Sequence, residues 1–200
     1  MTKIIKKSAM ATQFLIIAVV IWSFCSVMLF NDPSVYGENN LLENTQVLTL
    51  LLTLILFTLP ILDRFRNDRL LSIFFSFLAL GFILRELDVE KFDLPSIMIT
   101  LGSGEGRNII LAIGVLSTLA YALFKFRYYL DLAICFIRGR TGFATLAAGL
   151  FLVIGDIFEN FQIQHHILYE ESFELVGYSV LLMAASRLAR REVKTSRFIR

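Results

Sequence analysis

Long apolar runs constrain this chain more than any other feature of its sequence. Stretches of about 20 mostly apolar residues recur along the chain, and an α-helix needs a run of that length to cross the hydrocarbon core of a bilayer. Hydrophobic residues make up 56% of the 200 residues and charged residues 18%, whereas soluble domains have about 25% charged residues. These values exclude a disordered, collagen-like or disulfide-rich chain and predict an all-α integral membrane protein.

We expect one bundle of six transmembrane helices and no separate soluble domain. The predicted spans cover residues 10–30, 43–62, 70–86, 108–125, 141–158 and 171–187. Two further apolar stretches, 94–101 and 128–137, are too short to cross and are interpreted as interfacial or re-entrant segments. The first span is longer than the apolar part of a cleaved signal peptide, which has about 7–15 residues, so we expect it to be retained.

The basic residues predict the orientation of the bundle. Sixteen of the 19 Lys and Arg residues fall on one side of the predicted spans, together with four acidic residues. The opposite side holds the other three basic residues and 13 of the 17 acidic residues, so the two sides carry about +12 and −10. Because basic loops stay in the cytoplasm, both termini are expected to be cytoplasmic. The absence of an Asn-x-Ser/Thr sequon favours a bacterial inner membrane.

Acidic residues on the outer side gather at the ends of the predicted spans. Three pairs with a spacing of three residues stand there: Glu43/Gln46, Asp156/Glu159 and Glu171/Glu174. Residues three apart share one face of a helix, so each pair presents its oxygens in one direction. Carboxylates next to hydrocarbon need water, a shared proton or a bound cation.

A divalent metal ion is the cofactor that such oxygens favour. Carboxylates alone suit Ca²⁺ or Mg²⁺, and a histidine among them suits Zn²⁺ or iron. The candidate ligands are Glu43, Asp156, Glu159, His166, Glu171 and Glu174. The alternative is ordinary interfacial polarity. Glu43 and Glu171 are expected at helix N-termini, where a carboxylate is stabilised by about 0.3–1 kcal/mol without any ligand.

Arg85, Glu86 and Asp88 close the third predicted span and are the candidates for catalysis. Arg85 can hold a phosphate or carboxylate of a substrate with two parallel hydrogen bonds. It can also pair with Glu43 or Glu171 across the bundle, and we prefer this role because acids far outnumber bases on the outer side.

Two further patterns concern packing. Ala144 with Ala148, and Thr145 with Gly149, are small residues at helical spacing, which predicts close helix contacts around the fifth span. We therefore expect that span at the centre of the bundle, where it would bury Asp156. The glycine-rich segment 102–108 is interpreted as a flexible turn capped by its last residue, Asn108.

Cys25 and Cys135 lie half a bilayer apart in the predicted topology and are expected to be free thiols.

Three functions remain open on these grounds. The first is a membrane protein with a carboxylate-rich metal site on the non-cytoplasmic face that hydrolyses a lipid or lipid-linked substrate. The second is a non-enzymatic interaction or assembly subunit with a membrane protein as its partner. The third is a cation or proton-coupled transporter, which the scarcity of charge at mid-span disfavours. In each case the chain works in the lipid bilayer, and no nucleic-acid partner is expected.

Overall fold

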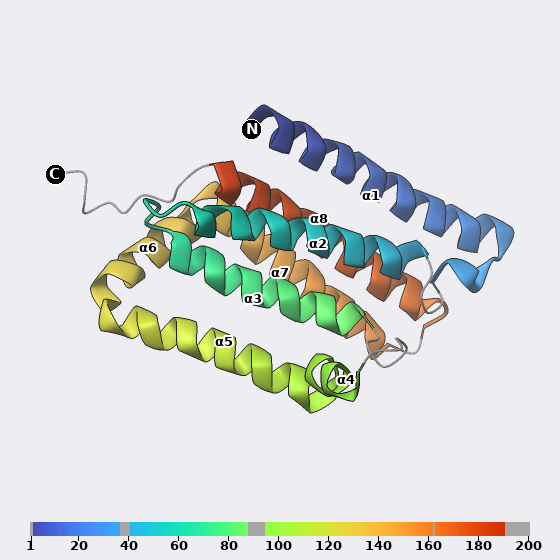
Figure 1. Ribbon diagram of the computed structural model, residues 1–200. Helices are drawn as coiled ribbons and strands as arrows, with labels where there is room; N and C mark the ends of the chain where they lie inside the picture. Colours follow the sequence, from blue (N-terminus) through green and yellow to red (C-terminus); the bar gives the residue numbers. More distant parts are fainter. Residues whose placement is uncertain (1, 37–40, 88–94, 162, 191–200) are drawn as a thin grey trace.

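All regular structure is helical in the computed structural model of the chain, which describes residues 2–36, 41–87, 95–161 and 163–190. The elements in chain order are α1 (Thr2–Phe30), the 3₁₀ helix η1 (Pro33–Tyr36), α2 (Leu41–Leu62), α3 (Arg69–Glu86), α4 (Ser96–Gly102), α5 (Gly104–Phe124), α6 (Phe126–Arg138), α7 (Arg140–Glu159) and α8 (His166–Arg190). The six long helices run side by side, and α4 and α6 are short helices at opposite ends of the bundle (Figure 1). The prediction of an all-α chain is confirmed for the described residues.

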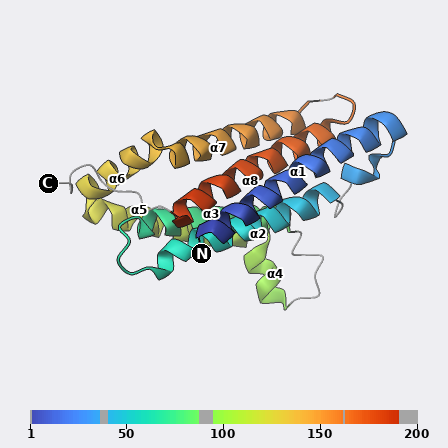
Figure 2. The ribbon, with the colours of Figure 1, turned by 90° about the horizontal axis from the view of Figure 1, so that it is seen from above.

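Among the described residues, five helices are long and apolar enough to cross a membrane, namely α1, α2, α5, α7 and α8. The predicted third span coincides with α3, but this helix has only 18 residues and three of them are Arg69, Arg85 and Glu86. At a rise of about 1.5 Å per residue it is about 27 Å long, slightly less than the hydrocarbon thickness of a bilayer. It packs against α2 and α5 within the bundle (Figure 2).

The centre of the bundle is α8, which contacts α7, α2 and α1. In the most apolar stretch of α8, 61% of the residues are buried, against 22% in that of α7 and 6% in that of α5. The expectation that the fifth span is central is therefore wrong. The cause is a run of small residues on α8, including Gly177, Ala184 and Ala185, which lets three neighbouring helices approach it closely.

Several predicted helix boundaries shift. The first helix begins at Thr2 rather than near residue 10, and α8 begins at His166, five residues before the predicted start. The glycine-rich segment is not a flexible turn capped by Asn108, because α5 already begins at Gly104. Gly104 has a φ of +50°, a backbone conformation that glycine adopts readily, and it follows α4 after the single residue Ser103.

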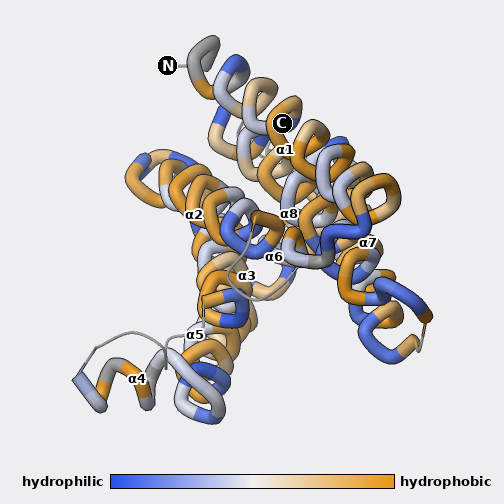
Figure 3. Tube along the Cα trace, turned by 90° about the vertical axis from the view of Figure 1, so that its right-hand side faces the viewer, coloured by the Kyte–Doolittle hydropathy of each residue, from blue (hydrophilic) through white to orange (hydrophobic). Residues whose placement is uncertain are grey.

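The two ends of the bundle have different chemistry. The start of α1, the turn 63–68, α6 and the end of α8 lie together at one end, which we call the basic end (Figure 1). The opposite end, which we call the acidic end, holds the end of α3 and the connection from α7 to α8. Figure 3 views the molecule from this end, with hydrophilic segments nearest the viewer and mostly hydrophobic helices behind them.

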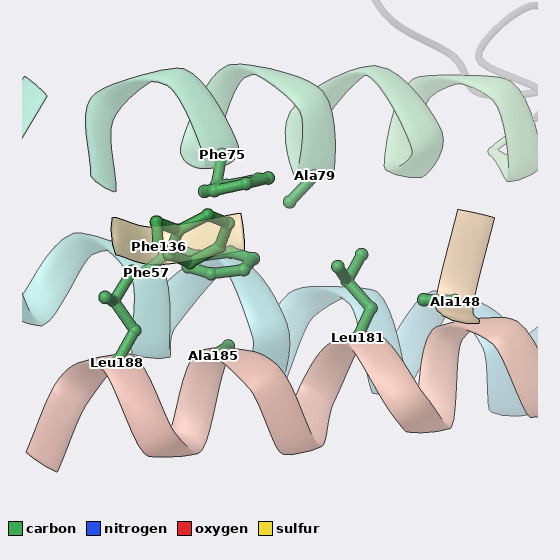
Figure 4. Close-up of a cluster of buried hydrophobic side chains, with 8 residues drawn as sticks. All are labelled: Phe57, Phe75, Ala79, Phe136, Ala148, Leu181, Ala185 and Leu188. Atoms are coloured by element: carbon green, nitrogen blue, oxygen red, sulfur yellow. The ribbon is translucent and has the colours of Figure 1, made fainter. Parts of the chain in front are cut away.

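A buried apolar cluster occupies the half of the bundle towards the basic end. Phe57 of α2 stacks on Phe75 of α3 with ring centroids 5.2 Å apart, and Phe136 of α6 lies 5.3 Å from Phe75 (Figure 4). Ala185 and Leu188 of α8 complete this side of the cluster. The predicted interfacial segment 128–137 is thus part of the helix α6, whose Leu132 and Phe136 are buried.

Arginine side chains donate hydrogen bonds to carbonyl groups near the C-terminal ends of helices at the basic end. Arg66 donates to the carbonyl oxygen of Leu188 at 2.8 Å, near the end of α8, and forms an ion pair of 2.7 Å with buried Asp68. Arg69 donates to the carbonyl of Ile61 near the end of α2. A cation at a helix C-terminus interacts favourably with the last carbonyls, so these residues have a structural role.

Candidate functional site

Six polar side chains from three helices come together inside the bundle towards its acidic end. They belong to α2, α3 and α8, and we call them the polar cluster: Gln46, Arg85, Glu86, Glu171, Glu174 and Tyr178. Ionisable groups within membrane helices are costly to bury, so a group of this kind is a functional-site hypothesis by default.

Arg85 joins the members from α3 and α8. Its Nη2 forms an ion pair with Oε1 of Glu174, and its Nε donates to Oε1 of Glu86 at 3.0 Å. The Glu86 carboxylate also accepts a 2.7 Å hydrogen bond from the hydroxyl of Tyr178. The Glu174 and Glu86 side chains are 5% and 8% exposed, whereas Arg85 is 43% exposed, so the arginine lies at the mouth of the cluster.

Gln46 joins α2 to α8. Its Nε2 donates to Oε2 of Glu171 at 2.6 Å and to the backbone carbonyl of the same residue at 3.0 Å. The Gln46 side chain is fully buried, and its Oε1 has no hydrogen-bond partner among the residues that the structure describes. A buried oxygen without a donor costs about 1–3 kcal/mol, so this position favours a ligand with positive charge or a donor proton.

Helical spacing explains why these side chains meet. Glu171, Glu174 and Tyr178 are separated by three and four residues, so they share one face of α8, from which their side chains reach residues of α2 and α3. Deeper in the bundle, Leu50 and Ile83 pack with the Tyr178 ring and separate the cluster from the apolar core. The hydroxyls of Thr49 and Thr53, which share the Gln46 face, donate to carbonyls of their own helix.

The structure does not bring the two acids of α7 into the cluster. Asp156 and Glu159 are exposed, so the expectation that Asp156 is buried is wrong. The reason is the neighbouring Gly155, which faces α8 so closely that a Cβ there would lie 2.9 Å from Cγ of Glu174. Adjacent helical residues point about 100° apart, so burying Gly155 turns Asp156 outwards. Both acids still interact electrostatically with Glu170 of α8, at the rim of the cluster.

The remaining candidates have separate surroundings. Glu43 lies in the first turn of α2, as predicted, and is half-buried. His166 is the first residue of α8, whereas His165 contacts the hydroxyl of Tyr36 through Nδ1 at 3.0 Å. Asp88 lies outside the described residues. Glu171 is in the second turn of α8 and not at its N-terminus, so helix-end electrostatics do not explain its position.

Arg85 takes the pairing role that we preferred, but with Glu174 and Glu86 as its partners rather than Glu43 or Glu171. Tyr178 is the member that the sequence analysis missed. Its spacing from Glu174 contained the signal, because a tyrosine four residues after a buried acid shares its helix face.

The cluster holds more carboxyl groups than cations. Glu86, Glu171 and Glu174 lie near the single cation of the cluster, Arg85, and further acids stand at the rim. Arg85 occupies the position between Glu86 and Glu174. Within the part of the chain that the structure describes, no group of three or more His, Cys, Asp or Glu side chains is arranged as a metal site. The oxygens that the cluster leaves for a donor or a cation are those of Glu171 and Gln46 Oε1, and they do not form a ready-made ring of carboxylates among the described residues.

The two cysteines, Cys25 and Cys135, are free, as expected.

In comparisons with known proteins, the chain matches no protein-family model, no curated protein and no solved structure.

Proposed function

We propose that this protein spans the membrane six times and binds a divalent cation in the polar cluster on the non-cytoplasmic side. The single observation that carries the proposal is the buried pair Gln46–Glu171, in which a carboxylate lies beside an amide whose Oε1 has no donor among the described residues. Carboxylate and amide oxygens are ligands that Ca²⁺ and Mg²⁺ prefer.

The charge asymmetry and the arrangement of the helices support this topology. The starts of α1, α3 and α7 lie at the same end of the bundle as the ends of α2 and α8 (Figure 1). That end carries most of the Lys and Arg residues of the chain. The positive-inside rule then assigns the basic end and both termini to the cytoplasm, with α3 as a sixth span, and a bacterial inner membrane is the corresponding location.

The chemistry that such a site supports is metal-assisted hydrolysis of a lipid or lipid-linked substrate. The half-exposed Arg85 stands where it can contact an anionic group of the substrate, since its Nη1 makes no hydrogen bond with the described residues. Glu86 and Glu174 hold the guanidinium in place. A bound cation would polarise the substrate or a water molecule next to Glu171.

Cation-dependent thermal unfolding of the detergent-purified full chain tests the proposal. A ligand that binds only the folded state at 100 times its Kd stabilises it by about 2.7 kcal/mol. We expect Ca²⁺, Mg²⁺, Mn²⁺ or Zn²⁺ to raise the Tm of the wild-type protein. Glu171→Gln should abolish the shift. The matched control Glu105→Gln, which changes an exposed glutamate in the first turn of α5, should retain it.

Equal shifts for the wild-type protein and Glu171→Gln would place the cation elsewhere and contradict the proposal. A wild-type protein that responds to none of the four cations would also contradict it. The polar cluster would then be a structural network, as expected of an assembly subunit.

A further inference from the structure

A cavity lies at the basic end, far along the bundle from the polar cluster. It has a volume of about 1250 Å³ and opens between the start of α3, the end of α5 and the start of α6. In Figure 1 this is the corner where α5 turns into α6. The proposed cation site does not involve it, so the two can be tested separately.

The lining of this cavity is strongly basic. Five of the described lining residues are cations, and none of them is acidic. Arg66 and Arg69 are engaged with Asp68 and with helix-end carbonyls. The other three, Arg64, Lys125 and Arg127, are exposed and form no ion pair with the described residues. Like charges around one cavity repel each other, and an anion inside it would offset that repulsion.

Aromatic residues complete the wall. The ring of Tyr129 lies 6.2 Å from that of Tyr121 and 5.0 Å from that of Tyr128. Burial and the two neighbouring tyrosines raise the pKa of Tyr129, so its hydroxyl stays neutral and can donate a hydrogen bond. Tyrosines are common where membrane helices meet the interface.

An apolar groove continues from the cavity towards the middle of the bundle. It runs between α3 and α5, has a volume of about 460 Å³ and shares Leu70, Ile73 and Tyr121 with the cavity. Phe77 and Ile113 lie further along it. A basic cavity joined to an apolar groove has the shape and polarity of a site for one amphipathic anion, with a charged head and a hydrocarbon tail.

We propose that the cavity and the groove together bind one anionic phospholipid of the membrane leaflet at the basic end. Arg64, Lys125 and Arg127 hold its phosphate, and the α3–α5 groove accommodates an acyl chain. Basic pockets between transmembrane helices on the cytoplasmic side bind the headgroups of anionic lipids in this way. Phe65, in the adjoining turn, is 94% exposed, as expected of a side chain that lies in the same interface.

Lipid titrations of the detergent-purified full chain, read by native mass spectrometry, test this inference. We expect phosphatidylglycerol to be retained as one bound molecule and phosphatidylcholine to be lost. Lys125→Gln with Arg127→Gln should weaken phosphatidylglycerol binding about 30-fold, since each cation near an anionic headgroup contributes about one factor of five. The matched control is Arg138→Gln with Arg140→Gln, which removes two exposed cations of the same end outside the cavity, and it should bind normally.

The groove has its own variant. Ser117 is an exposed residue of α5 that lines the groove, so the larger side chain of Ser117→Phe fills the groove. This variant should weaken lipid binding without changing the affinity for inorganic phosphate. Equal losses of phosphatidylglycerol affinity in the two double variants would mean that any exposed cations of this end attract the lipid, and this would overturn the inference. Inorganic phosphate that binds as tightly as the lipid would also overturn it, because the occupant would then be a free anion.

Discussion

Arg85 forms a bridge between two helices through charged hydrogen bonds, and this sets what substitutions at its partners should do. The ion pair with Glu174 connects α3 to α8, and the contact with Glu86 stays within α3. Hydrogen bonds to charged groups contribute about 1.5–3 kcal/mol when they are shielded from water. Arg85 is half-exposed, so water can replace part of a lost partner.

Glu174→Gln should therefore lower the free energy of unfolding by about 1–2 kcal/mol. Equilibrium unfolding in mixed detergent measures this value. Glu105→Gln, on the exposed first turn of α5, is the matched control and should leave stability unchanged. Equal stability of the two variants would mean that the ion pair does not hold α3 on α8.

The hydrogen bond from Tyr178 to Glu86 allows a second test at this scale. Tyr178→Phe removes only the hydroxyl of a fully buried side chain. A double-mutant cycle with Glu86→Gln should give a coupling energy of about 1 kcal/mol, because residues in one hydrogen-bond network are not additive. Additive effects would show that the two side chains do not share a hydrogen bond.

At the scale of elements, the close packing of α7 depends on which of its small residues face a neighbour. A Cβ at Gly142 would lie 2.2 Å from the carbonyl oxygen of Phe136 and 2.6 Å from Cα of Ile137, both backbone atoms of α6. A Cβ at Gly149 would meet nothing within 4 Å. The two glycines stand in one helix and have opposite surroundings.

Gly142→Ala should cost about 1–3 kcal/mol of stability, because backbone atoms of α6 must move. Gly149→Ala should be neutral or stabilise the protein by up to about 1 kcal/mol, as expected for alanine in a helix. Thermal unfolding of the two variants side by side measures the difference. A destabilised Gly149→Ala would indicate that a partner helix packs on that face.

The elements also show what the sequence could predict. Apolar runs located six long helices, because desolvation dominates in a bilayer. Ala144 and Ala148 are buried as expected, but Gly149 is exposed. The sequence does not specify which face of small residues packs against a neighbouring helix. That packing decides the direction of Asp156, which points away from the polar cluster. The sequence does indicate the central position of α8. Its mean hydropathy of 1.2 is the lowest of the five apolar helices, as expected of a helix shielded from lipid.

The sequence predicted only part of the candidate site, because it does not specify which helix faces pack against each other. Helical spacing placed Gln46 on the buried face of α2 and linked Glu171 to Glu174. The partner of Arg85 could not be read in advance, because Glu171 and Glu174 belong to one helix and their distance from Arg85 depends on how α3 and α8 are rotated about their axes.

At the scale of the whole molecule, the charge asymmetry and the helix arrangement make one prediction about topology. In a variant without Cys25 and Cys135, single cysteines in the turn 63–68 should react with a membrane-permeant maleimide only. Single cysteines placed at Ser103 or Gln164, at the acidic end, should also react with an impermeant one applied from outside. Protection of Ser103→Cys from the impermeant reagent would mean that α3 does not cross the membrane.

The polar cluster connects these scales, because its acids exceed its cations inside the bundle and Gln46 Oε1 has no donor among the described residues. The most direct measurement is the metal content of the purified protein by mass spectrometry, for the wild-type chain beside Glu171→Gln and Glu105→Gln. We expect close to one divalent ion per chain in the wild type and in Glu105→Gln, and a loss of that ion in Glu171→Gln. Wild-type protein that is purified without metal and takes up no ion on dialysis against Ca²⁺, Mg²⁺, Mn²⁺ or Zn²⁺ would show that the polar cluster does not bind a divalent cation.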